Sequence, residues 1–247
     1  MYYGNMECPS QEFSQNVWDD KYCAVWHLND PYDSTKNGNN GVISGSSTSW
    51  KPGKSGLGLE ITNKGMMRDI PDSFDDSISS EFTVSSWVKW YGKDPSYPSP
   101  SYVFDARADL TYGGFILFIS EDGTVQFFQL IGNTFIRLRS ASTISKDTWT
   151  HVCVVYNYNS KDLCLFINGV EDNSTSISAT YHDTYLNPSI GNNRWGYIDG
   201  QYRPMNGITD ELHVLKTSRS TDWILTEYNN QNAPSNFMSF GPEELGP

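Results

Sequence analysis

The sequence predicts an all-β chain folded as an antiparallel β-sandwich, and three observations carry this prediction. Short runs rich in aromatic and β-branched residues recur about every 10–15 residues, with turn residues between them. Residues 82–90 alternate between two faces, one of which carries Phe82, Val84 and Val88. The chain shows neither a β-α-β rhythm nor a long helical pattern, and its 247 residues suit a single large all-β domain.

The expected elements follow one another along the chain. Residues 115–119 and 125–128 flank an Asp-Gly turn and predict a hairpin. Residues 220–229 are the one segment with a helical pattern, with Ser220 or Thr221 as its N-cap. Further strands are expected at residues 25–28, 41–43, 82–90, 135–138, 149–156, 163–167, 189–192 and 207–214, and one more after the glycine-rich turn in residues 50–61.

Composition and charge exclude some classes of function. The net charge is −12, so the chain lacks the basic face that nucleic-acid binding needs. No apolar run reaches the roughly 18 residues of a membrane span. No basic and apolar leader opens the sequence, so we expect any signal peptide to lie upstream of Met1. Aromatic residues make up 14% of the chain, which suits strands more than helices.

An oxygen-rich loop without an apolar residue, residues 33–41, follows the first core strand. Asp33, Thr35 and Asn37, with a glycine next, repeat the opening of a calcium loop, in which ligands alternate and a glycine makes the sharp turn. Ser44 stands where such a loop would close with a Glu, and no helices flank the segment, so it is not an EF-hand. The alternative is a plain Asx/Gly turn between strands.

A second acidic feature lies near the end of the chain, where Asp210 and Glu211 are adjacent in a strand of core character. Adjacent strand residues point to opposite faces, so the two carboxylates are not expected to form a close acid/base pair. A buried carboxylate is unfavourable unless it is paired or metal-bound. Asp210 is therefore the candidate second carboxylate for a cation at the Asp33 loop. Alternatively, Asp210 accepts hydrogen bonds from loop amides without a metal.

Four cysteines allow three pairings. Cys153 and Cys164 lie on two strand-like runs joined by residues 157–162, and an antiparallel hairpin could bring them face to face. Cys8 and Cys23 are then the remaining pair. The alternative is four reduced thiols that behave as small hydrophobic side chains. The spacing matches no zinc motif.

Aromatic residues in polar loops suggest a binding site. A ring face can cover the apolar side of a sugar while amides and carboxylates bond to its hydroxyls. The alternatives are that these rings pack under loops, or that they form a protein-binding surface. The candidate ligand-binding residues are Tyr91, Tyr112, Arg194, Trp195, Tyr197 and Tyr202.

Catalytic motifs are not found. The sequence holds no Gly-x-Ser-x-Gly segment, no His-Glu-x-x-His segment and no run of alternating carboxylates on one strand. His151 and Cys153 would share a strand face, but a core or disulfide role explains Cys153 better. We therefore expect no catalytic residues and a protein that is not an enzyme.

Six segments, in this order, resemble the laminin-G-like, concanavalin A-like lectin/glucanase jelly-roll domains of secreted and surface proteins. The resemblance covers roughly residues 23–232, which leaves residues 233–247 as a tail or linker. Residues 2–5 and 227–235 are similar to the subgroup that follows a domain of unknown function, number 2341, in archaeal and bacterial surface proteins, so residues 1–22 would be the tail of an upstream domain or a connector. The six segments are residues 25–28, 33–41, 82–88, 149–152, 165–169 and 207–212.

The resemblance implies a fold and a function. It implies two sheets of about six or seven strands and a structural calcium ion (Ca²⁺). It also implies an extracellular, non-catalytic binding or adhesion module whose partner is a glycan or cell-surface polymer. The alternative is a structural module of a surface layer, filament or virus fibre with protein partners, and a glycoside hydrolase is favoured least. Chelator is expected to lower the melting temperature, and Asp33→Ala to abolish that difference. The implied calcium ligands are Asp33, Asn37, Asn39, Asn40 and Asp210.

Overall fold

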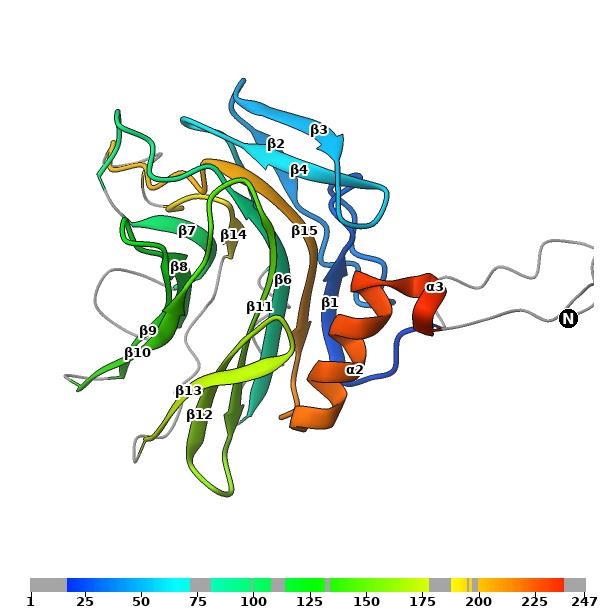
Figure 1. Cartoon of the computed structure of the whole chain (residues 1–247). Coiled ribbons are helices and arrows are strands. Elements are labelled where there is room, and N and C mark those ends of the chain that lie inside the picture. The colour runs from blue at the N-terminus through cyan, green and yellow to red at the C-terminus, as the bar shows by residue number, and fades with distance from the viewer. Residues whose placement is uncertain are drawn as a thin grey trace, which may run out of the picture.

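A computed structural model describes residues 17–71, 81–98, 100–107, 114–131, 134–177, 188–194, 196 and 200–237. In this part of the chain two antiparallel sheets pack face to face (Figure 1), which confirms the predicted β-sandwich. The first sheet contains β1 (Tyr22–Trp26), β3 (Thr48–Pro52), β4 (Leu57–Ile61), β6 (Phe82–Trp90), β11 (Trp149–Asn157), β12 (Asp162–Ile167), β13 (Val170–Ser176) and β15 (Gly207–Leu215). The second contains β2 (Val42–Ser44), β5 (Met66–Arg68), β7 (Ser101–Ala106), β8 (Phe115–Ile119), β9 (Thr124–Ile131), β10 (Thr134–Thr143) and β14 (Ser189–Ile190).

In the described ranges the first sheet has one strand more than expected, and the second agrees with the expected six or seven strands. The first has 8 strands in the order β13-β12-β11-β6-β15-β4-β3, with β1 pairing to β15 beside this path. The second has 7 strands in the order β10-β9-β8-β7-β14-β5-β2. The sequence did not predict β3, β5, β7 and β13. β3 and β13 are edge strands with mostly exposed side chains, so they lack the alternation that marks a half-buried strand.

Aromatic side chains fill the space between the sheets. Phe82 of β6 stacks on Phe115 of β8 with ring centroids 5.0 Å apart, which joins the two sheets directly. The rings of Phe127 and Phe104 lie 5.3 and 5.8 Å from that of Phe115. Each of these four side chains is buried. Rings of this size contribute both apolar burial and favourable ring–ring geometry to the core.

Helix α2 (Thr221–Asn232) covers the outer face of the first sheet beside β15 and β1 (Figure 1). Ser220 is its N-cap, as predicted, and accepts a hydrogen bond from the backbone N–H of Trp223. Ile224 packs on Cys153, Val155 and Phe166 of the sheet. A short helix, α3 (Pro234–Phe237), follows where the sequence indicated a tail.

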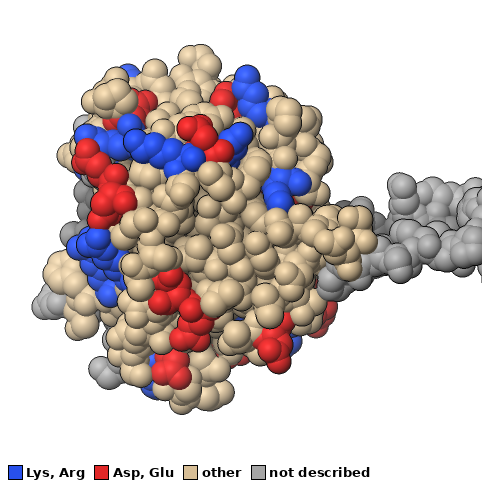
Figure 2. All heavy atoms as spheres, viewed as in Figure 1, with Lys and Arg blue, Asp and Glu red and all other residues tan. Residues whose placement is uncertain are grey.

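Charged side chains are scattered in small groups over the face of the molecule seen in Figure 2, and the area over α2 is largely uncharged. The helix itself carries only Asp222 and Glu227 as charged residues. None of the helices in the described part of the chain is long and apolar enough to cross a membrane.

The predicted Cys153–Cys164 disulfide is wrong, because both residues are free thiols. In the β11–β12 pair, Cys153 lies opposite Phe166 and Cys164 lies opposite Val155, so the two cysteines are diagonal neighbours. Diagonal positions on a sheet are about 7–8 Å apart, beyond the usual span of a disulfide. Cys23 is buried, and its predicted partner Cys8 lies outside the described residues, so that pairing stays a prediction.

Replacing Phe115 by Ala is expected to lower the free energy of unfolding by about 3–5 kcal/mol, because it leaves a cavity between the sheets. Urea denaturation followed by circular dichroism measures this change. Phe135→Ala is the matched control, since Phe135 is 70% exposed, and it should change stability by less than about 0.5 kcal/mol. Equal losses in both variants would contradict this assignment of the core.

Candidate functional site

The Asp33 carboxylate is the hydrogen-bonding centre of the oxygen-rich loop. Its Oδ1 accepts hydrogen bonds from the backbone N–H of Val25 (3.0 Å) and of Thr35 (2.9 Å). Its Oδ2 accepts one from the Thr35 hydroxyl (2.8 Å) and one from the backbone N–H of Asn39 (2.9 Å). Four donors fill the roughly four lone-pair positions of a carboxylate. The side chain therefore ties the loop to β1.

The asparagines of the loop add to the same attachment. Asn37 donates through Nδ2 to the carbonyl oxygens of Tyr22 and Cys23, at 2.9 and 3.0 Å. Asn39 donates through Nδ2 to the Cys23 carbonyl at 2.8 Å. The side-chain oxygen of Asn40 accepts a hydrogen bond from the backbone N–H of Asp33. Two of the three amides therefore present donors to β1.

Asp210 has a separate set of partners in the β3–β4 turn. Its Oδ2 accepts hydrogen bonds from the backbone N–H groups of Lys54 (2.7 Å) and Ser55 (2.9 Å), and its Oδ1 accepts one from that of Glu211. Burial raises the pKa of Asp210 to about 7, and the negative charge of Glu211 adds to this increase. The hydrogen bond from the Ser55 amide acts in the opposite direction and lowers the pKa. In this structure Asp210 therefore has the second of its two expected roles, in which it accepts hydrogen bonds from loop amides.

The five predicted calcium ligands do not fit a calcium cage in this arrangement. Calcium needs six to eight oxygen ligands. Both oxygens of Asp33 are already occupied by N–H and O–H donors, and Asp210 is held by a different turn. Across the described ranges, no group of three or more His, Cys, Asp or Glu side chains could hold a metal ion. Calcium binding stays a prediction, and this arrangement does not favour it.

The observed hydrogen bonds predict a result that differs from the one expected for a calcium site. Asp33→Ala should lower the free energy of unfolding by at least about 3 kcal/mol, the size of one strong hydrogen bond to a charged group. The loss should be the same in calcium and in chelator, which thermal unfolding measures. Asp30→Ala, which removes one exposed Asx-type bond to Tyr32, is the control and should have a smaller effect. A wild-type melting temperature that falls in chelator and recovers in calcium would contradict this prediction.

A bulge in β15 places both Asp210 and Glu211 on the sheet face that α2 covers. Asp210 lies opposite Trp87 and His213 lies opposite Ser85, so one extra residue is inserted between them. Glu211 adopts a left-handed backbone conformation with φ of 47°. The expectation that the two carboxylates point to opposite faces is therefore wrong, because it assumed a regular strand.

Glu211 belongs to a row of alternating imidazoles and carboxylates between the sheet and α2. Glu211 Oε2 lies 2.9 Å from His27 Nδ1 and 3.2 Å from His213 Nε2. His213 Nδ1 lies 2.8 Å from Glu227 Oε1 on α2. Sequence reasoning missed this row, since His27 follows β1, His213 lies in β15 and Glu227 lies in α2, and no sequence spacing relates them.

Charge pairing in this row shifts the pKa of His213 and of Glu211. Burial alone would lower the pKa of His213, but hydrogen bonds to Glu211 and Glu227 raise it to about 9. Burial would raise the pKa of Glu211, but its bonds to His213 and His27 lower it to about 2. His151, buried nearby without a carboxylate in contact, has its pKa lowered to about 4 by burial. His213 is therefore a cation at neutral pH and links α2 to the sheet.

The stabilising effect of His213 should depend on pH in a defined direction. Its pKa rises from 6.5 in the unfolded chain to about 9 on folding, so its contribution is fully present below pH 6.5 and lost as the pH rises through 9. The difference in unfolding free energy between wild type and His213→Gln should narrow over this range. Urea titrations of both proteins at matched pH values measure it, and a constant difference would contradict the assignment.

Tyrosines from two loops meet near the turn after β4. The Tyr91 hydroxyl donates to Glu60 Oε1 at 3.0 Å, and the Tyr97 hydroxyl donates to the side-chain oxygen of Asn63. The Tyr202 ring packs edge-on against that of Tyr97, with centroids 6.2 Å apart. We call Tyr91, Tyr97 and Tyr202, with Glu60, Asn63 and Lys64, the tyrosine cluster. Lys64 places its Nζ 5.4 Å from the Tyr202 ring centre.

Asn192, which is fully buried, joins two of the segments that carry the tyrosine cluster. Its Nδ2 donates to the carbonyl oxygens of Asn63 and Gly65, at 3.1 and 3.0 Å. Its Oδ1 accepts hydrogen bonds from the backbone N–H groups of Asn193 and Arg203. One side chain thus fixes the turn after β4 against the segment that carries Tyr202.

The predicted ligand-binding residues are only partly brought together. Tyr91 and Tyr202 belong to the tyrosine cluster, and Arg194 is half-buried two residues after Asn192. Tyr112, Trp195 and Tyr197 lie outside the described residues. Glu60 and Lys64 were missed, because neither is marked by a motif; Glu60 reads as an ordinary outward residue of a strand.

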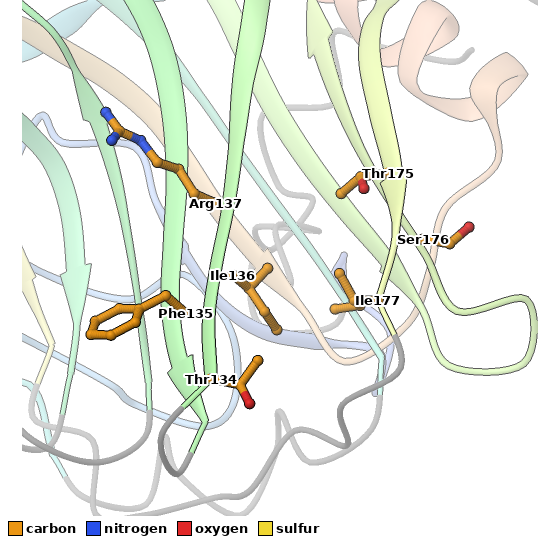
Figure 3. A pocket seen from close by; sticks show the side chains of 7 residues that line it. All are labelled: Thr134, Phe135, Ile136, Arg137, Thr175, Ser176 and Ile177. Carbon is orange, nitrogen blue, oxygen red and sulfur yellow. The ribbon is translucent and has the colours of Figure 1, made fainter.

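A cavity of about 270 Å³ lies between the edge strands β10 and β13 (Figure 3). Ile136 and Ile177 point toward one another, whereas Phe135 and Arg137 point to the other side of β10. Arg137 is engaged through Nε with Gln126. The cavity is lined mainly by aliphatic and hydroxyl groups. The tyrosine cluster, in contrast, combines rings with a carboxylate, an amide and an ammonium group, so it can select a ligand more specifically.

Residues 68–225 match the family model of the concanavalin A-like lectin/glucanases superfamily. The chain belongs to this superfamily. The match does not distinguish the subgroup that follows the domain of unknown function 2341, so that part of the resemblance stays a prediction. The comparison with curated proteins found no match.

Solved structures with the same fold include several binding domains. Domain 4 of AbnA, a GH43 extracellular arabinanase from Geobacillus stearothermophilus solved with arabinotriose, is 21% identical with a TM-score of 0.65, over 83% of this chain and 97% of that domain. The binding domain of Paraclostridial Mosquitocidal Protein 1 is 16% identical with a TM-score of 0.65, over 85% and 52%. The binding domain of botulinum neurotoxin DC, solved with SialylT, is 12% identical with a TM-score of 0.62, over 87% and 52%. This concanavalin A-like chain therefore spans about half the length of the two toxin domains, and at these identities the likeness shows the fold alone.

Proposed function

We propose that this chain is a non-catalytic carbohydrate-binding module of a secreted or cell-surface protein, and that the tyrosine cluster forms part of its glycan site. The observation that carries the proposal is the grouping of three half-buried tyrosines with Glu60, Asn63 and Lys64, at a place where Asn192 joins the turn after β4 to the segment that carries Tyr202. Ring faces suit the apolar side of a sugar, and the polar groups suit its hydroxyls. The superfamily and the arabinotriose-bound relative support the same class of ligand.

The electrostatics of the cluster suit hydroxyl recognition. Glu60 accepts hydrogen bonds from Ser49 and Tyr91 and lies 3.7 Å from the ammonium group of Lys51, so its charge is partly balanced. Burial raises the pKa of Tyr91 to about 12, and the bond to Glu60 adds to this increase. Tyr91 therefore stays a neutral donor over the physiological pH range.

A glycan array, followed by calorimetry with the best ligand, tests the proposal. Tyr97→Ala and Tyr202→Ala should each weaken binding about tenfold, which corresponds to about 1.4 kcal/mol. Tyr158→Ala is the matched control, because Tyr158 is 40% exposed on the β11–β12 turn and does not belong to the cluster. Its affinity should equal that of the wild type.

The proposal fails if no glycan binds, or if both cluster variants bind as well as the wild type.

A structural module with protein partners is the second candidate. It is supported by Trp50 and Leu57, which are 43% and 45% exposed and share one face of the β3–β4 hairpin. Oligomers in light scattering, together with unaltered behaviour of the tyrosine variants, would favour that candidate.

A further inference from the structure

A second cavity, of about 240 Å³, lies between α2 and the segment that leads into β1. Its lining combines aromatic rings from Trp18, Tyr22 and Trp223 with polar groups from Glu227, Asn230 and Gln231. The tyrosine cluster lies on loops at the other end of the sandwich, away from α2 (Figure 1). This cavity, which we call the helix cavity, is therefore a separate feature.

The carboxylate of Glu227 is held in place by the row of imidazoles behind it. Its Oε1 lies 2.8 Å from His213 Nδ1, and His213 is in turn held by Glu211. The His213 side chain is 3% exposed and that of Glu227 is 12% exposed, so the pair forms the floor of the helix cavity. Among the described residues, none donates a hydrogen bond to Glu227 Oε2. This oxygen is free to accept a hydrogen bond from a ligand.

Amide groups on α2 supply donors at the same place. The Gln231 Oε1 atom accepts a hydrogen bond from the Trp87 indole N–H at 2.6 Å, which fixes the amide and leaves Nε2 as its remaining donor. Asn230 is exposed, lines the helix cavity, and has no hydrogen bond from its side chain within the described part of the chain. Acceptor and donors therefore stand within one small space.

Two of the aromatic walls are fixed by their neighbours. The Trp18 ring lies 4.8 Å from that of Tyr22 and 5.5 Å from the His213 ring. The Arg219 guanidinium lies 4.0 Å from the Trp223 ring centre, and 43% of Trp223 still remains exposed. Rigid rings lose little conformational entropy when a ligand stacks on them.

Most of the charge around the helix cavity is paired. The protonated His213 stands between Glu211 and Glu227, so these three groups together carry one net negative charge, and the Arg219 guanidinium lies 3.7 Å from Asp19. The outer surface over α2 is largely uncharged (Figure 2). Because the amides of Asn230 and Gln231 lie beside the Glu227 carboxylate, the lining suits a neutral ligand that both donates and accepts hydrogen bonds.

We propose that the helix cavity binds a single neutral sugar ring, with Glu227 accepting from a ring hydroxyl and Asn230 and Gln231 donating to others. Its 240 Å³ is below the roughly 300 Å³ at which pockets begin to enclose drug-sized ligands, which suits one ring rather than an extended chain. The inference does not rest on the tyrosine cluster, so the two sites stand or fall separately.

Saturation-transfer NMR with D-glucose, D-galactose, N-acetylglucosamine and L-arabinose as separate probes tests this site. At least one sugar should receive saturation from the wild-type protein. Asn230→Ala and Trp223→Ala should each weaken that sugar's affinity about tenfold. Asn229→Ala, an exposed neighbour on the same helix that does not line the cavity, is the matched control and should bind as the wild type does. Tyr202→Ala should also leave this binding unchanged.

Three outcomes would overturn the proposal. No saturation transfer to any of the four sugars would do so. Transfer that is lost in Tyr202→Ala but kept in Asn230→Ala and Trp223→Ala would assign the sugar to the tyrosine cluster instead. Binding of tetramethylammonium in place of the sugars, with the same dependence on Trp223, would make the helix cavity a cation site.

Discussion

The two adjacent carboxylates in the middle of β15 impose the constraint on which much of the structure depends. β15 is paired with β6, β4 and β1, and the outer face of this sheet is covered, so both acids are buried. Asp210 is satisfied by the backbone of the β3–β4 turn, and Glu211 by His27 and His213. An unpaired buried carboxylate would be strongly unfavourable. The position of the hairpin and the docking of α2 both follow from the way these two charges are paired.

The Asp33 loop performs a similar task with backbone donors instead of imidazoles. Its carboxylate collects N–H groups from both sides of the loop, while Asn37 and Asn39 return donors to the carbonyl oxygens of β1. Oxygen-rich sequence is thus explained by hydrogen bonding within the chain. The same side chains would serve a cation only after their present donors had moved.

The sequence was sufficient for the sandwich and for the start of α2, because alternation and capping are local signals. Ser220 caps the helix as expected, and the strands around the predicted Asp-Gly hairpin form β8 and β9. The site was harder to predict. One inserted residue at Glu211 reversed the expected direction of a carboxylate, and the partners His27, His213 and Glu227 meet only through tertiary packing. The tyrosine cluster was half predicted, since Tyr91 and Tyr202 stood in polar loops whereas Glu60 carried no signal.

Trp18 and α2 come from opposite ends of the described chain, yet they wall the same cavity. Residues 17 and 237 therefore emerge on one side of the sandwich, and the tyrosine loops are presented on the other (Figure 1). A ligand at the tyrosine loops would therefore be bound on the side of the sandwich that lies away from both ends of the described chain.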